Sequence, residues 1–175
     1  MKHQLFQLSI STPDGRFIAR YSTKGLAELK FPAGGRADLL VGQDARQRDP
    51  TNVANKIPTQ ILRWHRAAEA GLKSSLAGRK PKNLPPLDLS GTEFQRKVWN
   101  ALRKISAGRT KSYGEVAQAI GQPKAVRAVG GACGANPVPV LVPCHRVLAP
   151  HGKIGGFGGG LEWKRKLLAK EGVVL

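Results

Sequence analysis

A short apolar segment bounded by prolines, residues 137–143, constrains this chain more than any other stretch. Its sequence, Pro-Val-Pro-Val-Leu-Val-Pro, is apolar and rich in β-branched valine, which predicts a buried extended run. Proline has a fixed φ and donates no ladder hydrogen bond, so Pro143 ends the run. Cys144, His145 and Arg146 follow without a gap. The last proline of the run therefore sends Cys144 out of the strand in a set direction, with two basic side chains in the same turn.

The Cys144-His145-Arg146 sequence suggests nucleophilic chemistry. Only the thiolate is a strong nucleophile, and a free thiol with a pKa of ~8.5 is mostly protonated at neutral pH. A neighbouring imidazole or guanidinium raises the thiolate fraction. Because adjacent side chains in an extended chain point apart, His145 is expected to act on Cys144 through a water. The alternative is a buried structural cysteine, and the dipeptide alone does not separate the two.

The chain is strongly basic, with a formal net charge of +18 at pH 7 and a pI of about 10.7. Neutralising phosphates releases counterions and drives association, so a polyanionic partner is expected. A basic surface that maintains solubility is the alternative. The positive charge is spread over both halves of the sequence, so charge alone does not locate a binding face.

Composition narrows the class of protein further. Hydrophobic residues make up 41% of the chain, which argues against wholesale disorder. No apolar run approaches the ~20 residues that cross a bilayer, and the first residues do not resemble a secretory signal. Cys133 and Cys144 are too few for a disulfide framework. A reduced, cytoplasmic protein without membrane contact is expected.

The N-terminal part of the sequence predicts a small sheet-plus-helix domain over residues 1–85. The expected elements are a hairpin over 4–21 with a Pro13-Asp14-Gly15 turn, a strand over 26–31, a loop over 33–55 and a helix over 58–76. His65 on that helix has no metal-ligating neighbours in sequence and is expected to be structural or exposed. Residues near 78–88, rich in proline and basic side chains, indicate a linker to a second domain over 89–175.

The second domain is expected to be mostly helical. Thr92 is the predicted N-cap of a first helix that Gly108 ends, and Ser112 caps a short second helix over residues 113–120. A third helix is expected over residues 124–133. Two short helices joined by a glycine-containing turn are typical of a helix-turn-helix, although many helical hairpins bind nothing.

The third predicted helix is composed almost entirely of small residues. Gly130 and Gly131 lie in its interior, where each glycine costs on the order of 1 kcal/mol relative to alanine. Close approach of this helix to a binding partner would explain that composition. Close packing against another helix is the alternative.

Five motifs occur together and in one order along the second half of the chain. They are Lys-Ser-Tyr113-Gly-Glu-Val-Ala, the segment 124–131, Asn136-Pro-Val-Pro, Pro-Cys144-His-Arg, and Leu-Leu-Ala-Lys-Glu171-Gly. With these motifs the chain resembles the O6-alkylguanine-DNA alkyltransferases over roughly residues 91–172. The resemblance implies an α/β (α+β) fold, with a ribonuclease H-like N-terminal domain and a winged helix-turn-helix-like second domain.

The resemblance also implies a function. It is direct-reversal DNA repair, in which an alkyl group of O6-alkylguanine, and of O4-methylthymine, moves irreversibly from a flipped-out base to Cys144 in a single turnover. It implies a monomer that binds double-stranded DNA through the minor groove, in the cytoplasm or at a nucleoid, without metal or cofactor. The main alternative is a non-catalytic alkyltransferase-like damaged-DNA-binding protein; a transcription regulator and a cysteine hydrolase are weaker ones.

The resemblance assigns catalytic roles residue by residue. Cys144 is the acceptor, and His145 and Glu171 form a relay that removes its proton through a water. Asn136 braces the turn before the acceptor. Tyr113 donates its hydroxyl towards N3 of the flipped base, which stabilises the leaving guanine.

It assigns DNA-binding and pocket roles in the same way. Arg127 fills the gap that the flipped nucleotide leaves in the base stack. The other residues of the groove-facing helix are Lys124, Ala125, Ala128, Gly130 and Gly131, and the substrate pocket is formed by Pro139, Val147, Phe157 and Gly158. Phe157 and Gly158 stand where some relatives have tyrosine and serine. Cys133 is expected to be a packing residue, not a second acceptor.

Overall fold

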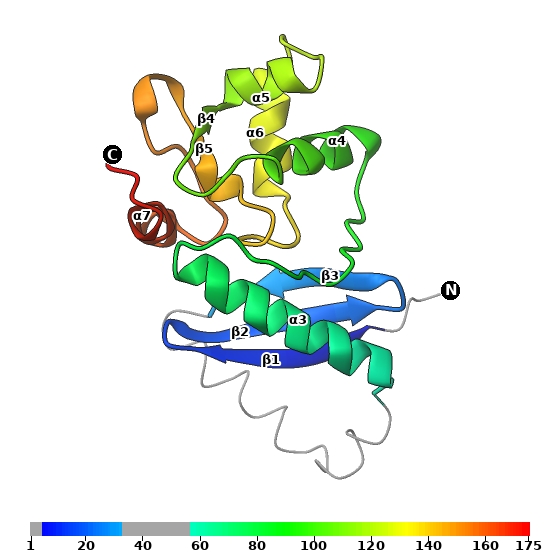
Figure 1. Ribbon diagram of the computed structural model, residues 1–175. Coiled ribbons are helices and arrows are strands. Elements are labelled where there is room, and N and C mark those ends of the chain that lie inside the picture. The colour runs from blue at the N-terminus through cyan, green and yellow to red at the C-terminus, as the bar shows by residue number, and fades with distance from the viewer. Residues whose placement is uncertain (1–4, 33–56) are drawn as a thin grey trace.

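The computed structural model describes residues 5–32 and 57–175, and its N-terminal part is built on a three-stranded antiparallel sheet (Figure 1). The strands are β1 (Phe6–Thr12), β2 (Gly15–Ser22) and β3 (Gly25–Lys30), in that spatial order. Gly15 has a φ of +116°, which suits glycine in the tight turn between β1 and β2. The predicted hairpin and third strand are confirmed.

One long helix, α3 (Thr59–Leu76), lies across the sheet (Figure 1). Its buried stripe includes Ile61, Ala68 and Leu72, at the spacing that one helical face requires. His65 is joined to the buried Tyr21 hydroxyl at 3.1 Å, which is a structural contact. The predicted helix is confirmed, and the predicted loop over residues 33–55 lies outside the described residues.

The predicted linker is ordered against the edge of the sheet. Leu26 donates its amide to the Pro86 carbonyl at 2.8 Å and accepts from the Asp88 amide at 2.9 Å. The Ser22 hydroxyl adds a 2.6 Å hydrogen bond to the Asp88 carboxylate. This segment therefore pairs with part of the edge of β3 that faces away from β2.

The remaining elements form a mostly helical half. They are α4 (Glu93–Leu102), β4 (Lys111–Ser112), α5 (Tyr113–Ala119), α6 (Val126–Gly134), η1 (Cys144–Arg146), β5 (Val147–Leu148), η2 (Pro150–Gly152) and α7 (Leu161–Lys170). Thr92 and Ser112 each close a capping box at the start of α4 and α5, as expected from their sequence positions. The short strands β4 and β5 pair in parallel, a contact that the sequence did not predict. The fold is thus a mixed α/β fold with a small antiparallel sheet and five α-helices in the described residues.

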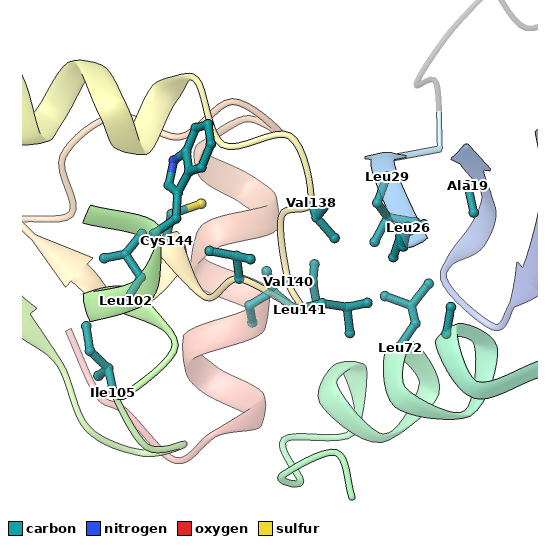
Figure 2. Close-up of a cluster of buried hydrophobic side chains, with 14 of the residues drawn as sticks. Ala19, Leu26, Leu29, Leu72, Leu102, Ile105, Val138, Val140, Leu141 and Cys144 are labelled. Carbon is teal, nitrogen blue, oxygen red and sulfur yellow. The ribbon is translucent and has the colours of Figure 1, made fainter. Parts of the chain in front are cut away.

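A continuous apolar core joins the two halves (Figure 2). Val138, Val140 and Leu141 lie between the residues of the sheet and α3 on one side and those of α4 on the other. Val140 is buried with a φ of +72°, which is a strained backbone for a β-branched residue. The described helices include none that is long and apolar enough to cross a membrane.

Candidate active site

Cys144 is the first residue of η1, immediately after the proline-bounded segment. Its backbone amide donates to the Val142 carbonyl at 2.8 Å, which turns the chain sharply at Pro143. The Cys144 side chain is buried, with 6% of its surface exposed. The segment before it is not the predicted extended strand: it folds into a turn in which the Val142 amide donates to the Val138 carbonyl at 2.9 Å. The predicted change of direction after Pro143 is present, and the sulfur lies at the wall of a cavity.

Asn136 holds the sulfur from one side. Its amide nitrogen donates to the Cys144 sulfur at 3.0 Å and to the Val142 carbonyl at 2.8 Å. Its side-chain oxygen accepts from the Val138 amide at 3.1 Å, which fixes the orientation of the amide group. A donor aimed at sulfur stabilises the thiolate more than the thiol.

His145, Glu171 and Arg146 form a buried network beside Cys144. The His145 Nε2 atom lies 3.0 Å from a Glu171 carboxylate oxygen, and Arg146 donates to the same carboxylate at 2.8–3.1 Å. Burial would raise the pKa of Glu171, but the hydrogen bonds from His145 and Arg146 outweigh it and lower this pKa to about 2. Glu171 is therefore ionised at neutral pH and orients the imidazole.

The second ring nitrogen of His145 points away from this carboxylate. Its Nδ1 atom is buried and has no hydrogen-bond partner within residues 5–32 and 57–175. Burial lowers the pKa of His145, although Glu171 opposes that effect, so the ring is neutral near pH 7. A neutral ring that donates from Nε2 to Glu171 keeps Nδ1 as a proton acceptor.

Arg146 does not act on the sulfur as its sequence position suggested. Its guanidinium is taken up by Glu171 and by the Ile105 carbonyl, at 2.5 Å. The cation that acts electrostatically on Cys144 is Lys164, which opposes the increase in thiol pKa caused by burial. Burial remains the larger effect, and the pKa of Cys144 is above its ordinary value.

Lys164 is the functional candidate that the sequence analysis missed. It lies on α7 and is fully buried, with its ammonium 2.7 Å from the Val147 carbonyl. Lys164, Leu167 and Leu168 form one buried stripe at helical spacing. A lysine within an apolar stripe was the available signal, because a buried ammonium needs partners that the sequence does not name.

Replacing Lys164 with methionine is expected to slow reaction of the Cys144 thiol roughly tenfold, because a cation that stabilises the thiolate is removed. The melting temperature should change little, since methionine fills a similar volume and removes a desolvated charge. The rate of thiol alkylation by iodoacetamide and thermal melting would measure the two effects. Arg165→Met, an exposed change on the same helix, is the control. Equal reactivity of the two variants would contradict the assigned role.

A cavity of about 410 Å³ opens at the sulfur. It brings together five of the predicted site residues, namely Asn136, Pro139, Cys144, Phe157 and Gly158, and it is also lined by residues 28–32 from the end of β3. Its volume lies within the usual range for sites that take small organic groups. The contribution of β3 was not expected from the sequence.

Two other predicted site residues lie just outside this lining. Tyr113 is half-buried at the start of α5, and burial followed by the nearby thiols of Cys133 and Cys144 raises the pKa of its hydroxyl. Val147 is fully buried, and its carbonyl already accepts from Lys164. A carbonyl has two lone pairs, so a second donor can still bind to the Val147 oxygen.

Cys133 is the second free thiol of the described residues. Burial raises the pKa of Cys133 to about 12, which fits a packing residue.

The helix α6 exposes the small residues Ala128, Gly131 and Gly134 to solvent. Val129 and Ala132 face the core, and the Trp99 indole donates to the Ala132 carbonyl at 2.8 Å. A Cβ built at Gly131 would meet no atom of the described structure within 4 Å, and one at Gly130 would make only ordinary contact with Tyr113. Packing inside the protein therefore does not require these glycines. Lys124, Arg127 and Ala128 are exposed, and Ala125 is partly exposed.

Fold and site together define a mixed α/β protein in which a buried cysteine site adjoins a pair of short packed helices. The model of the 6-O-methylguanine DNA methyltransferase DNA-binding domain matches residues 93–173. A methylated-DNA–protein-cysteine methyltransferase of Methanosarcina acetivorans is 48% identical over 109 residues, which are 62% of this chain and 70% of that protein. The chain belongs to the 6-O-methylguanine DNA methyltransferase family.

Other relatives extend the comparison. A methylated-DNA–protein-cysteine methyltransferase of Mycolicibacterium paratuberculosis is 59% identical over 85 residues, which are 49% of this chain and about half (52%) of that protein. The structure of Mycobacterium tuberculosis OGT in complex with DNA has a TM-score of 0.69 and 36% identity, over 93% of this chain and 90% of that one. The similarity to solved structures therefore includes the N-terminal part, which lies outside the roughly 91–172 range of the family motifs.

Proposed function

We propose that this protein repairs alkylated DNA by moving the alkyl group from O6 of guanine, and from O4 of methylthymine, to Cys144. The single observation that carries this proposal is the buried sulfur at a cavity wall, held by Asn136 and placed beside the His145–Glu171 pair. Each of these groups matches the chemistry of a thiolate that attacks carbon. The relatives named methylated-DNA–protein-cysteine methyltransferases support the same reaction.

The step is a displacement at the alkyl carbon. The thiol proton leaves through a water to Nδ1 of His145, and the imidazolium is stabilised by Glu171. A bond forms between the Cys144 sulfur and the alkyl carbon as the bond from that carbon to O6 breaks. The electron pair passes to the guanine, and the Tyr113 hydroxyl donates to N3 of that base. A thioether has no easy route back to a thiol, so each molecule acts once.

The base reaches the sulfur only after it rotates out of the duplex, at a cost of a few kcal/mol. We assign α6 to the minor groove, where exposed small residues allow close approach, and Arg127 to the gap in the base stack. Phe157 then stacks on the flipped base, with the Gly158 amide directed to O6 and Pro139 at the pocket wall. The carbonyls of Cys144 and Val147 accept from its amino group.

The domain organisation belongs to the same proposal. Residues 1–85 form a ribonuclease H-like supporting domain, and residues 89–175 form a winged helix-turn-helix-like domain that binds DNA and holds Cys144. The protein acts as a monomer in the cytoplasm, or at the nucleoid in a prokaryote. Its high positive charge supports binding to double-stranded DNA.

Incubation with a duplex that carries one O6-methylguanine tests the proposal directly. The tryptic peptide that contains Cys144 should gain the mass of one methyl group in place of hydrogen, with at most one transfer per protein molecule. Cys144→Ala should abolish transfer and retain binding to the damaged duplex. Binding without any gain in mass would instead identify a non-catalytic damaged-DNA-binding protein.

Arg127→Ala is expected to slow transfer from duplex DNA about tenfold, because the flipped state loses the side chain that fills the stack. Transfer from O6-methylguanine in single-stranded DNA should change much less, since no base pair has to open. Single-turnover rates on the two substrates give the ratio. Arg109→Ala removes an equal charge from an exposed position outside α6 and is the control. Equal losses on both substrates would contradict the assignment.

A further inference from the structure

The N-terminal sheet reaches the cavity beside Cys144. Glu28, Leu29, Lys30, Phe31 and Pro32 contribute to the lining of the same 410 Å³ cavity as Cys144 and Phe157. The end of β3 is fixed there, because Leu29 is buried and donates its amide to the Pro137 carbonyl at 2.8 Å. That carbonyl lies in the turn between Asn136 and Cys144. The N-terminal part is therefore attached to the active-site turn and forms a side of the cavity.

Phe31 is the large apolar side chain of this wall. Its ring packs against Phe157 with the ring centroids 5.6 Å apart and an angle of 72° between the rings. The Phe31 ring also packs against Phe17 and Trp163, with centroid distances of 5.5 Å and 4.9 Å. The contact with Phe157 is edge-to-face and the other two are tilted, and aromatic contacts of these kinds favour a defined ring position. Phe31 thus contacts both the aromatic pair Phe17 and Trp163 and the residue proposed to stack on the flipped base.

Gly159 shows how closely Phe31 approaches the loop of Phe157. A Cβ built at Gly159 would lie 2.5, 2.7 and 2.9 Å from three atoms of the Phe31 ring. Real Cβ atoms do not approach so closely, and the contacts of the ring with Phe17 and Trp163 restrict its movement. The absence of a side chain at position 159 is therefore matched to the presence of the ring at position 31.

We infer that Phe31 is a specificity-determining residue that limits the size of the alkyl group transferred to Cys144. This inference rests on the proposed function. When an alkyl carbon lies at the Cys144 sulfur, the remaining atoms of the alkyl group must fit in the cavity that Phe31 and Cys144 both line. A methyl group needs no room beyond the reacting carbon, whereas a benzyl group needs space for a ring. Selectivity against large groups is set by a side chain from outside the catalytic half.

The test compares single-turnover rates on two duplexes, one with O6-methylguanine and one with O6-benzylguanine. The ratio of the benzyl rate to the methyl rate should rise roughly tenfold in Phe31→Ala and by a smaller factor in Phe31→Leu, as the wall recedes. Phe94→Leu is the matched control, because Phe94 on α4 is also a partly buried phenylalanine packed on the core but belongs neither to the cavity lining nor to the aromatic contacts of Phe31. It should leave the ratio unchanged.

A second pair of variants tests the contact itself. Gly159→Ala is expected to slow methyl transfer about tenfold, because the added methyl group displaces the ring or the loop. Adding Phe31→Ala should restore most of that rate, a coupling that two independent sites would not show. Phe31→Leu keeps the test decisive if the alanine variant does not fold.

The outcomes separate this inference from the proposed function. No methyl transfer by the unmodified protein would overturn the proposed function. Methyl transfer with an unchanged benzyl-to-methyl ratio in both Phe31 variants, or with no rescue of Gly159→Ala, would overturn the role of Phe31 alone.

Discussion

Replacing Asn136 with aspartate is expected to slow alkyl transfer roughly a hundredfold to a thousandfold. The new carboxylate would stand where the amide now donates to the Cys144 sulfur at 3.0 Å. A negative charge at that distance raises the pKa of the Cys144 thiol further, and the donor that favours the thiolate is lost. The side-chain oxygen that accepts from Val138 is kept, so the turn retains part of its bracing.

The pH dependence distinguishes this effect from structural damage. Because the pKa of the thiol is raised, the Asn136→Asp rate should increase progressively as the pH rises from 7 to 9, measured by single-turnover transfer. Asn100→Asp adds the same charge at an exposed position on α4 and is the control. A rate that is low and independent of pH would mean that the variant has lost the fold of the turn, and the electrostatic explanation would be wrong.

Replacing Glu171 with glutamine is expected to reduce both activity and stability. Transfer should slow roughly a hundredfold, because His145 loses the charge that stabilises its protonated form. The free energy of unfolding should fall by about 3 kcal/mol, because the guanidinium of Arg146 remains buried without its carboxylate. Single-turnover kinetics and urea denaturation measure the two losses.

Acid sensitivity gives an independent check on Glu171. Its pKa is about 2 in the folded protein against an ordinary value of 4.5, so the stability that it contributes is fully present above pH 4.5. That contribution is lost as the pH falls from 4.5 to 2. The Glu171→Gln variant should lack this part of the acid transition, whereas the exposed Glu162→Gln change on the same helix should retain it. Identical pH profiles for all three proteins would contradict the assigned pair.

Local sequence signals predicted much of the helical half. Thr92 and Ser112 cap α4 and α5 through side chains only three residues from their partners, so their positions can be read without the fold. The parallel pairing of β4 and β5 was not predicted. Each strand has two residues, and two such strands far apart in sequence leave no periodic pattern.

The site residues also fall into those that could be predicted from the sequence and those that depend on the fold. Cys144 and His145 could be identified from their own sequence, and Glu171 entered through the resemblance to a family. Lys164 and Phe31 depended on tertiary structure, because one is defined by the carbonyls around a buried ammonium and the other by the docking of β3. The sequence suggested that Arg146 would provide a cation for the Cys144 sulfur. In the fold Lys164 of α7 provides it instead.

The apolar residues between the two halves have a consequence for how the molecule melts. Val138, Val140 and Leu141 pack on both sides at once, so neither half can unfold without exposing the surface that stabilises the other (Figure 2). Heating should produce a single cooperative transition with the same midpoint for tryptophan fluorescence and for circular dichroism. A fragment that begins after the linker would carry an uncovered apolar surface and tend to aggregate.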